Sequence, residues 1–272
     1  MAAYMMSKAK EAVVDRLVSI VRPRQFRGKF RLLDPFVPHE GERAATVFGF
    51  KIVLDLSRNI QRAIYIGNYE RRETKLVRSI LKSGMTVLDV GANVGYYTAL
   101  AARIVGPNGR VFAVEPYPPN FQRLSTWITD NHAAQVNAFD FALGSTPGAS
   151  QMFSAFADTD NPVMVAHGQP SVASVRVQML DSWMNDWRVD RVDFLKLDVD
   201  GSETAVLAGA SDTLADGRIS MVLCEFCDEW LVQVGSSIEA LWRTFLSAGF
   251  KPVWPAAKIP SVRLFNQLFV HG

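Results

Sequence analysis

The chain has little cysteine and little histidine, and these shortages exclude several kinds of site. Its 272 residues include two cysteines, Cys224 and Cys227, too few for a disulfide-stapled secreted fold. Their C-x-x-C spacing could hold zinc only with two further ligands, and the four histidines form no paired motif that would supply them. Because Cys224 lies in an apolar run, we expect it to be a small hydrophobic residue near the end of a buried strand.

Excess charge and long hydrophobic runs are also absent. Lys plus Arg number 29 and Asp plus Glu number 27, so the formal net charge of +2 indicates no polyanionic partner, and we expect no nucleic-acid binding. No apolar run approaches the ~20 residues needed to cross a bilayer. The N-terminus also lacks a signal-peptide core, so we expect a cytoplasmic protein with no integral membrane segment.

The N-terminal region predicts a helix and a small β unit. Residues 8–22 have the spacing of an amphipathic helix, which we expect to pack onto its own domain, with a homodimer contact or a membrane surface as alternatives. The apolar residues on one face of this helix are Ala12, Val13, Leu17, Ile20 and Val21. Segments 45–56 and 61–66 have β character and predict an antiparallel unit that covers the front of the main domain. We therefore assign residues 1–60 to an N-terminal extension and residues 61–272 to the main domain.

From residue 86 onward, strand and helix patterns alternate, which is typical of an α/β protein with a mostly parallel sheet covered on both faces. The predicted strands lie near 86–90, 110–115, 135–142, 192–198, 219–226, 249–254 and 263–270. The predicted helices lie near 94–105, 119–131, 202–214 and 236–248. Residues 145–180 interrupt this alternation, and we expect them to form a hairpin plus a mobile loop that folds over a substrate.

A glycine-containing turn joins the first of these strands to its helix. Gly91 and Gly95 allow the backbone to come close to a ligand, and the following helix offers unpaired N–H groups. A dinucleotide fingerprint would have glycine where Asn93 stands, and a phosphate-binding loop would continue into Gly-Lys-Ser or Gly-Lys-Thr, whereas Gly95 is followed by Tyr96. S-adenosylmethionine, which has no phosphate, suits this loop better. An ordinary tight turn in an α/β sheet remains the alternative.

An acidic residue follows the second predicted strand. Glu115 stands 24 positions after Gly91, at the carboxyl end of the strand. A carboxylate at this point can accept hydrogen bonds from both hydroxyls of a ribose, which is why nucleoside-binding α/β folds place an acid there. Together with the glycine turn, Glu115 strengthens the prediction of an adenosine-containing ligand.

Charged residues also lie in and after the fourth predicted strand. Alternation places Lys196, Asp198 and Asp200 on one side, and Glu203 begins the following helix. Charges are costly inside a buried strand unless they are paired or used, so we interpret Lys196 mainly as an internal ion-pair partner of Asp89 or Asp198. Glu225 is expected at the end of the neighbouring strand.

These segments resemble the FkbM family of S-adenosylmethionine-dependent methyltransferases. The matching motifs are Val-Leu-Asp-Val-Gly-Ala-Asn-Val-Gly-Tyr-Tyr-Thr at 87–98, Val-Glu-Pro at 114–116 with Asn120, Ala-Leu-Gly at 142–144, Leu-Lys-Leu-Asp-Val-Asp-Gly at 195–201 with Glu203, Leu-Cys-Glu at 223–225 and Gly-Asn-Tyr-Glu at 67–70. One departure is Asp200, where the family usually has glutamate. The resemblance implies a class I Rossmann-like fold, with a three-layer α/β/α arrangement and a seven-stranded sheet whose last strand is antiparallel.

The resemblance also implies a set of cofactor-binding residues. In this set the residues after the first strand hold the methionine end, Glu115 holds the ribose, Ala142 and its neighbours hold the adenine, and Tyr69 and Glu70 close the site. The full set is Tyr69, Glu70, Asp89, Gly91, Ala92, Asn93, Gly95, Tyr96, Glu115, Pro116, Asn120, Phe141, Ala142 and Asp198.

The activity that the resemblance implies is O-methylation of a small-molecule hydroxyl, in a sugar or a natural-product intermediate. We expect Asp198 to act as the base or orienting group, with Glu225, Asp200, Glu203 and Lys196 as competitors. Asp198 and Glu225 could hold a divalent metal, but clustered carboxylates can equally hydrogen-bond sugar hydroxyls, so we expect none. The alternatives are an RNA or protein methyltransferase of the same fold and a catalytically silent cofactor-binding protein.

Overall fold

The computed structural model describes residues 2–24, 26–153, 164 and 170–272, with the side chains of residues 12 onward. Its main element is a seven-stranded sheet in which β12 is antiparallel to both of its neighbours and the pairs β10–β9, β9–β3, β3–β4 and β4–β5 are parallel. The order across the sheet is β11 (Phe250–Trp254), β12 (Leu264–His271), β10 (Met221–Cys227), β9 (Phe194–Leu197), β3 (Thr86–Val90), β4 (Arg110–Val114) and β5 (Val136–Phe139). The predicted fold class is therefore confirmed.

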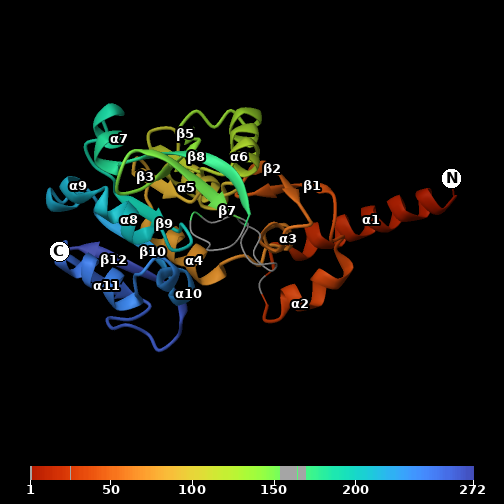
Figure 1. Cartoon of the computed structure of the whole chain (residues 1–272). Helices are drawn as coiled ribbons and strands as arrows, with labels where there is room; N and C mark the ends of the chain where they lie inside the picture. Colours follow the sequence, from red (N-terminus) through yellow and green to blue (C-terminus); the bar gives the residue numbers. More distant parts are fainter. Residues whose placement is uncertain (1, 25, 154–163, 165–169) are drawn as a thin grey trace.

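Helices cover both faces of this sheet because its central strands are apolar on both sides. Along β3, Val87 belongs to one hydrophobic core, whereas Leu88 and Val90 belong to the other. The first core includes residues of α4 (Arg71–Ile80), α5 (Tyr96–Val105) and α6 (Pro118–Asp130). The second core includes residues of α7 (Leu180–Asp186), α8 (Glu203–Ala208), α9 (Ser211–Ala215), α10 (Asp228–Gln233) and α11 (Ile238–Ser247). This arrangement forms three layers, α/β/α (Figure 1).

The N-terminal extension adds to the first of these cores. It comprises α1 (Ala2–Val21), α2 (Lys29–Leu33), η1 (Asp34–Phe36) and a hairpin of β1 (Glu42–Val47) and β2 (Phe50–Asp55). Phe48 and Gly49, both with positive φ, form the two-residue turn of the hairpin, as the twist of paired strands favours. The extension lies at one end of the molecule, and the C-terminal elements lie at the other (Figure 1).

The β prediction for residues 61–66 is wrong, because this segment lies in helix α3 (Asn59–Ile66). Its isoleucines and tyrosine favour a strand locally, but Gln61, Ile64 and Tyr65 are three and four positions apart and share one buried face of the helix. Gly67 ends the helix in the left-handed conformation, with φ 75°, and its N–H bonds to the last turn.

The apolar face predicted for the N-terminal helix does not pack onto its own domain. Val13, Leu17 and Ile20 are 59%, 52% and 49% exposed. Val18 and the partly buried Val14 make the contact with the first core instead. The helix therefore contacts the domain along a single row of side chains. Its N-terminal part extends beyond the body of the molecule (Figure 1).

Two further predictions need correction. The helix expected at 202–214 is two helices, α8 and α9, because Gly209 packs so closely on the Gly144 carbonyl that a Cβ would lie 2.0 Å from its oxygen. The strand expected at 135–142 is divided into β5 and β6 (Phe141–Leu143), and β6 belongs to a separate sheet.

This separate sheet contains the hairpin predicted in the 145–180 insert. Its order is β6–β8–β7, where β7 (Gly148–Phe153) and β8 (Ser171–Gln178) are antiparallel. The loop predicted to fold over a substrate falls largely on residues 154–163 and 165–169, which are outside the described residues. None of the helices in the described part of the chain is long and apolar enough to span a bilayer.

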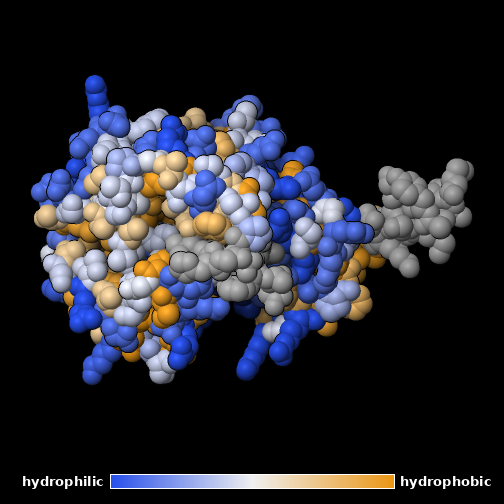
Figure 2. Space-filling model, in the orientation of Figure 1, coloured by the Kyte–Doolittle hydropathy of each residue, from blue (hydrophilic) through white to orange (hydrophobic). Residues whose placement is uncertain are grey.

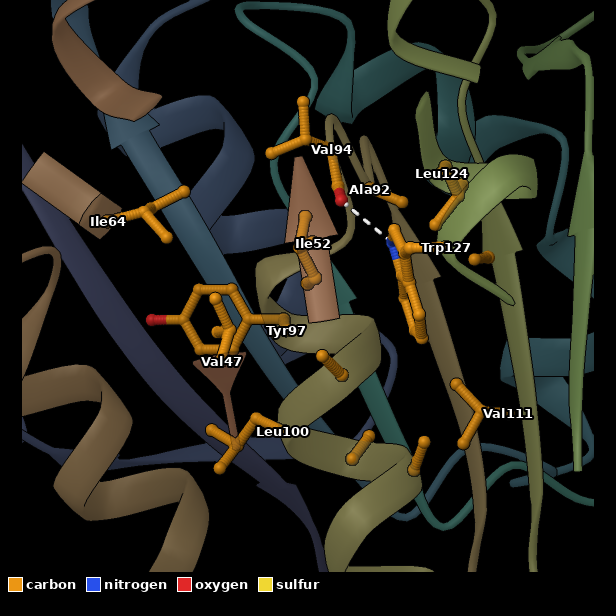
Figure 3. Close-up of a cluster of buried hydrophobic side chains, with 14 of the residues drawn as sticks. Val47, Ile52, Ile64, Ala92, Val94, Tyr97, Leu100, Val111, Leu124 and Trp127 are labelled. Carbon is orange, nitrogen blue, oxygen red and sulfur yellow. Dashed lines mark hydrogen bonds between the residues drawn. The ribbon is translucent and has the colours of Figure 1, made fainter. Parts of the chain in front are cut away.

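Trp127 connects the first core to the glycine turn. Its side chain is 2% exposed, and its indole N–H donates to the Val94 carbonyl over 3.0 Å (Figure 3). Leu124 lies beside it, and Val47 and Ile52 of the N-terminal hairpin belong to the same core. If the Val94 carbonyl lost this donor, it would remain buried without a hydrogen bond, and the free energy of its desolvation would no longer be compensated.

We therefore expect Trp127→Phe to lower the free energy of unfolding by about 2 kcal/mol, from the lost hydrogen bond and a small cavity. Urea unfolding followed by far-ultraviolet circular dichroism measures this. Trp187→Phe is the control, because Trp187 is 43% exposed and no hydrogen bond of its indole is observed among the described residues. An equal loss in both variants would contradict the role given to the Trp127 hydrogen bond.

Candidate functional site

The candidate site is a cavity at the carboxyl ends of β3, β4, β9 and β10. β3 lies between β4, the next strand of the sheet along the chain, and β9. The carboxyl end of β3 is therefore the topological switch point, where open α/β sheets bind ligands. The sequence-predicted residues that line the cavity are Tyr69, Asp89, Gly91, Ala92, Asn93, Tyr96, Glu115, Pro116, Asn120, Ala142, Lys196, Asp198, Asp200 and Glu225.

The turn after β3 approaches the turn after β9 very closely. Gly91 has a φ of 83°, and a Cβ on it would lie 1.7 Å from the Asp198 carbonyl oxygen. Asn93 also has a positive φ of 53°, a conformation that asparagine tolerates better than most residues. The N–H groups of Gly91 and Ala92 both donate to the Val114 carbonyl, which holds the turn against β4. The turn is therefore rigid and placed beside the acidic residues.

Glu115 is buried directly after β4, and its carboxylate faces the turn that follows β3. Its two oxygens accept hydrogen bonds from the backbone N–H groups of Asn93, at 2.7 Å, and Tyr117, at 2.8 Å. Burial raises the pKa of Glu115 to about 7, although these hydrogen bonds and one with Asn120 oppose the shift. Each oxygen keeps a further lone pair, so the ionised side chain can still accept donors from a ligand in the cavity.

Asp89 and Lys196 lie side by side because β3 and β9 pair in parallel with these two residues in register. Asp89 is 2% exposed and accepts a hydrogen bond of 2.6 Å from the Thr98 hydroxyl. Burial raises the pKa of Asp89 to about 6, while Thr98 and the Lys196 charge lower it in part. Asp89 therefore binds the start of α5 to β3 and contributes charge at the base of the cavity.

Lys196 lies at the centre of an acidic cluster. Its ammonium group is 2.8 Å from an Asp198 carboxylate oxygen, so the predicted ion pair with Asp198 is observed. The carboxylate oxygens of Glu70, Asp198 and Glu225 lie within 4.8 Å of one another. Burial alone would lower the pKa of Lys196, but the charges of Asp198, Glu70 and Glu225 outweigh it and raise that pKa. Lys196 therefore stays charged and neutralises part of the cluster.

The remaining two acids after β9 have different surroundings. Glu203 turns back to its own loop and accepts from the N–H groups of Val199, at 3.1 Å, and Gly201, at 3.3 Å. Asp200 has a φ of 47° and lines the cavity. Burial, reinforced by the charge of Asp198, raises the pKa of Asp200 to about 8. Glu203 thus supports the loop, whereas Asp200 faces the cavity.

Besides Glu203, three predicted residues lie outside the cavity lining. Gly95 faces Leu124, where a Cβ would lie 2.6 Å from a methyl carbon. Phe141 packs against Phe139 in the second core, with ring centroids 5.6 Å apart. Glu70 accepts a hydrogen bond from the Tyr97 hydroxyl and contacts the acidic cluster from the N-terminal side.

Two polar residues of the cluster, Tyr97 and Asn266, were not predicted from the sequence. Tyr97 binds Glu70, and its ring lies 5.4 Å from the Lys196 ammonium group. Asn266 pairs with Glu225 in the β10–β12 register, and its side chain is 3.4 Å from Lys196. The available signal for Asn266 was a polar side chain in the middle of an apolar strand, which is costly unless it is hydrogen-bonded.

We expect Gly91→Ala to lower the free energy of unfolding by about 3 kcal/mol, because the new Cβ adds a backbone clash to the left-handed strain. Gly84→Ala is a matched control, since Gly84 has the same φ of 83° and open space around its α-carbon. The control should lose about 1 kcal/mol from strain alone. Urea unfolding of both variants makes the comparison, and equal losses would refute the close approach to Asp198.

The chain is similar to known methyltransferases. The family model for the methyltransferase FkbM domain matches residues 89–252. The chain is 26% identical over 162 residues to Methyltransferase 1 of Beauveria bassiana, which covers 52% of this chain and 64% of that protein. It is 34% identical over 84 residues to a ribosomal RNA large subunit methyltransferase E of Oleidesulfovibrio alaskensis, which covers 29% and 39%. The chain thus matches less than two thirds of the length of these relatives.

A solved structure of a methyltransferase FkbM from Methylobacillus flagellatus is also similar, with 17% identity, a TM-score of 0.47, and coverage of 78% of this chain and 52% of that one. The family match carries the assignment, because it spans more than half of the chain and includes the turn after β3, Glu115, Asp198 and Glu225. The protein therefore belongs to the FkbM methyltransferase domain family.

Proposed function

We propose that the cavity binds S-adenosylmethionine and that the protein methylates a hydroxyl group of a small molecule. The observation that carries this proposal is the convergence of Glu115, the Gly91 turn and the acidic cluster on one cavity. An adenosine with an amino-acid end matches this set of groups, since Glu115 accepts ribose hydroxyls and the carboxylates attract an ammonium group. Ala142, Leu143 and Met152 supply an apolar wall for the adenine.

S-adenosylmethionine supplies an electrophilic methyl group when it is bound. What remains for the protein is to orient an acceptor oxygen, exclude water and remove a proton. Asp198 lies at the end of β9, where one carboxylate oxygen binds Lys196 and the other has no partner among the described residues. Lys196 thus fixes the rotamer of Asp198 and stabilises its charge, and the second oxygen accepts the hydroxyl proton.

The competing acids are less suited to this role. Burial, together with the charge of Asp198, raises the pKa of Glu225 well above its usual value and that of Asp200 to about 8. Asp200 therefore holds a proton near neutral pH and can donate a hydrogen bond to an acceptor oxygen, and burial makes the charged form of Glu225 less favourable. Asp198 would be the proton acceptor, and Glu225 and Asp200 would orient the acceptor.

We propose that no divalent metal is needed, because a lysine already supplies the positive charge. Glu70, Asp198 and Glu225 could together hold a metal ion. Lys196 is hydrogen-bonded to Asp198 and attracted by the other two carboxylates, so a metal would compete with an ammonium group that is part of the fold. This differs from sites in which a metal lowers the pKa of the acceptor.

Turnover with a panel of hydroxylated glycosides and polyketides, followed by mass detection of methylated products, tests the activity. We expect Asp198→Asn to lower kcat about 100-fold or more by removing the base. The affinity for S-adenosylhomocysteine, measured by calorimetry, should change little. Asp186→Asn, an exposed position on α7, is the control. Methylation that stops when EDTA is added would refute the metal-independent mechanism, and no cofactor binding would refute the proposed function.

Cofactor affinity should also depend on pH through Glu115. In the cofactor-free protein the pKa of Glu115 is raised to about 7 by burial, so the group is protonated at lower pH and ionised at higher pH. The ionised form accepts ribose hydroxyls, so S-adenosylhomocysteine should bind about tenfold more tightly near pH 8 than near pH 6. Glu115→Gln should weaken binding and remove this dependence. A wild-type affinity that falls with rising pH would contradict the role of Glu115.

A further inference from the structure

A second cleft lies on the N-terminal side of the cofactor cavity. It is bounded by α1, by the end of β1 and the turn that follows it, and by α4. Its lining is strongly basic, since it includes four arginines and one lysine but one carboxylate. These cations are Arg22, Arg71, Arg72, Lys75 and Arg78. On the face shown in Figure 2, hydrophilic side chains dominate the region beside the base of α1.

Helical spacing explains why the charges gather there. Arg71, Lys75 and Arg78 lie four and three positions apart, so they share one exposed face of α4. Arg22 enters from the end of α1, and burial lowers the pKa of its guanidinium. The balanced total charge of the chain therefore conceals a local excess of positive charge.

No carboxylate neutralises this excess in the described part of the chain. Arg71 donates to the Phe26 carbonyl over 3.0 Å, and Arg22 donates to the Ile64 carbonyl over 3.2 Å. Arg78 lies 5.2 Å from the centre of the Phe48 ring. None of the five cations has a carboxylate within ion-pair distance among the described residues, and the one acid of the lining, Asp15, is held by Tyr65 and Arg43.

The same excess of positive charge affects the pKa of a neighbouring lysine, Lys29. Lys29 has no exposed surface and donates to the Arg22 and Gly67 carbonyls. Burial, followed by the charges of Arg71 and Arg22, lowers the pKa of Lys29 to about 8. Positive charges that are crowded in a concave site whose one carboxylate is already paired attract an anion.

The cleft and the cofactor cavity share a wall. Ile64, Tyr69 and Tyr96 line both of them. The Tyr96 hydroxyl bonds to Thr74 of α4 at 3.0 Å and to the Tyr69 carbonyl at 3.3 Å, and the two tyrosine rings meet edge to face, with centroids 5.0 Å apart. A ligand held in the cleft is therefore next to the cofactor cavity, with two tyrosines between them.

We propose that this cleft binds a phosphate-type anion carried by the acceptor, so that the substrate is a phosphorylated or nucleotide-linked hydroxyl compound. The assignment of the anion to the acceptor rests on the proposed methyl transfer, whereas anion binding itself does not. Arginine suits phosphate, because its planar guanidinium can donate two parallel hydrogen bonds to one group. The concave shape of the cleft favours a compact anion over an extended polymer.

Calorimetry with inorganic pyrophosphate tests the site directly. We expect saturable binding that weakens at high salt, and about tenfold weaker binding for Lys75→Glu, which removes one charged contact and adds a repulsive one. Lys75→Ala is a milder variant in case the charge reversal disturbs folding. Arg243→Glu is the matched control, because Arg243 is an exposed helical residue of α11 that does not line the cleft. It should bind pyrophosphate as the wild type does.

Two further measurements separate this proposal from the proposed function. S-adenosylhomocysteine should bind the wild type and all these variants with equal affinity. A wild-type protein that binds pyrophosphate but not S-adenosylhomocysteine would refute the proposed methyl transfer and leave the anion site intact. With acceptors, phosphorylated glycosides should be methylated, and Lys75→Glu should raise their KM about tenfold with little change in kcat.

Several outcomes would overturn the anion site. These are no saturable pyrophosphate binding by the wild type, or equal pyrophosphate binding by Lys75→Glu and the control. Methylation of uncharged acceptors alone would refute the assignment of the anion to the acceptor. Much tighter, salt-sensitive binding of single-stranded RNA would assign the cleft to a nucleic acid instead.

Discussion

The buried ion pair of Lys196 and Asp198 is the interaction on which the site depends. A lysine that is 1% exposed would be strongly destabilising without carboxylate partners, because desolvation of an ion costs several kcal/mol. Asp198 and the nearby Glu70 and Glu225 compensate for this cost from three different segments of the chain. The ammonium group in turn keeps three carboxylates together at one edge of the sheet, where they would otherwise repel one another.

Backbone packing places this pair next to the ligand site. Gly91 touches the Asp198 carbonyl, so the turn that faces the cofactor cavity and the loop that carries the acid cannot move independently. Glu203 holds the same loop from the other side through two backbone N–H groups. Trp127 then connects the glycine turn to the core that the N-terminal hairpin completes (Figure 3). The extension therefore supports the site as well as forming one side of the basic cleft.

Local patterns predicted most elements of the sheet and failed where tertiary packing opposed them. Residues 86–90 and 110–114 are short, mostly apolar runs that are followed by Gly91 and Glu115, so both strands were recognisable. The segment 61–66 looked like a strand, since β-branched residues are ambiguous in short runs. On α1, Val18 is buried and Leu17 is exposed, although both are apolar, because the domain touches one stripe of the helix. The position of that contact is not encoded in helical spacing.

The sequence by itself determined the family, the alternation of strands and helices, and the acids near the carboxyl ends of β4, β9 and β10, because each motif is contiguous and its chemistry depends on a few neighbouring residues. Only the tertiary structure decided which groups meet. Asn266 joins Lys196 through strand order and register, whereas Glu70 and Tyr97 join it through the packing of α4 and α5. Arg22 joins Arg71 through the path of the extension. Such contacts connect residues that are tens to hundreds of positions apart, and electrostatic interactions depend on distance in space rather than along the chain.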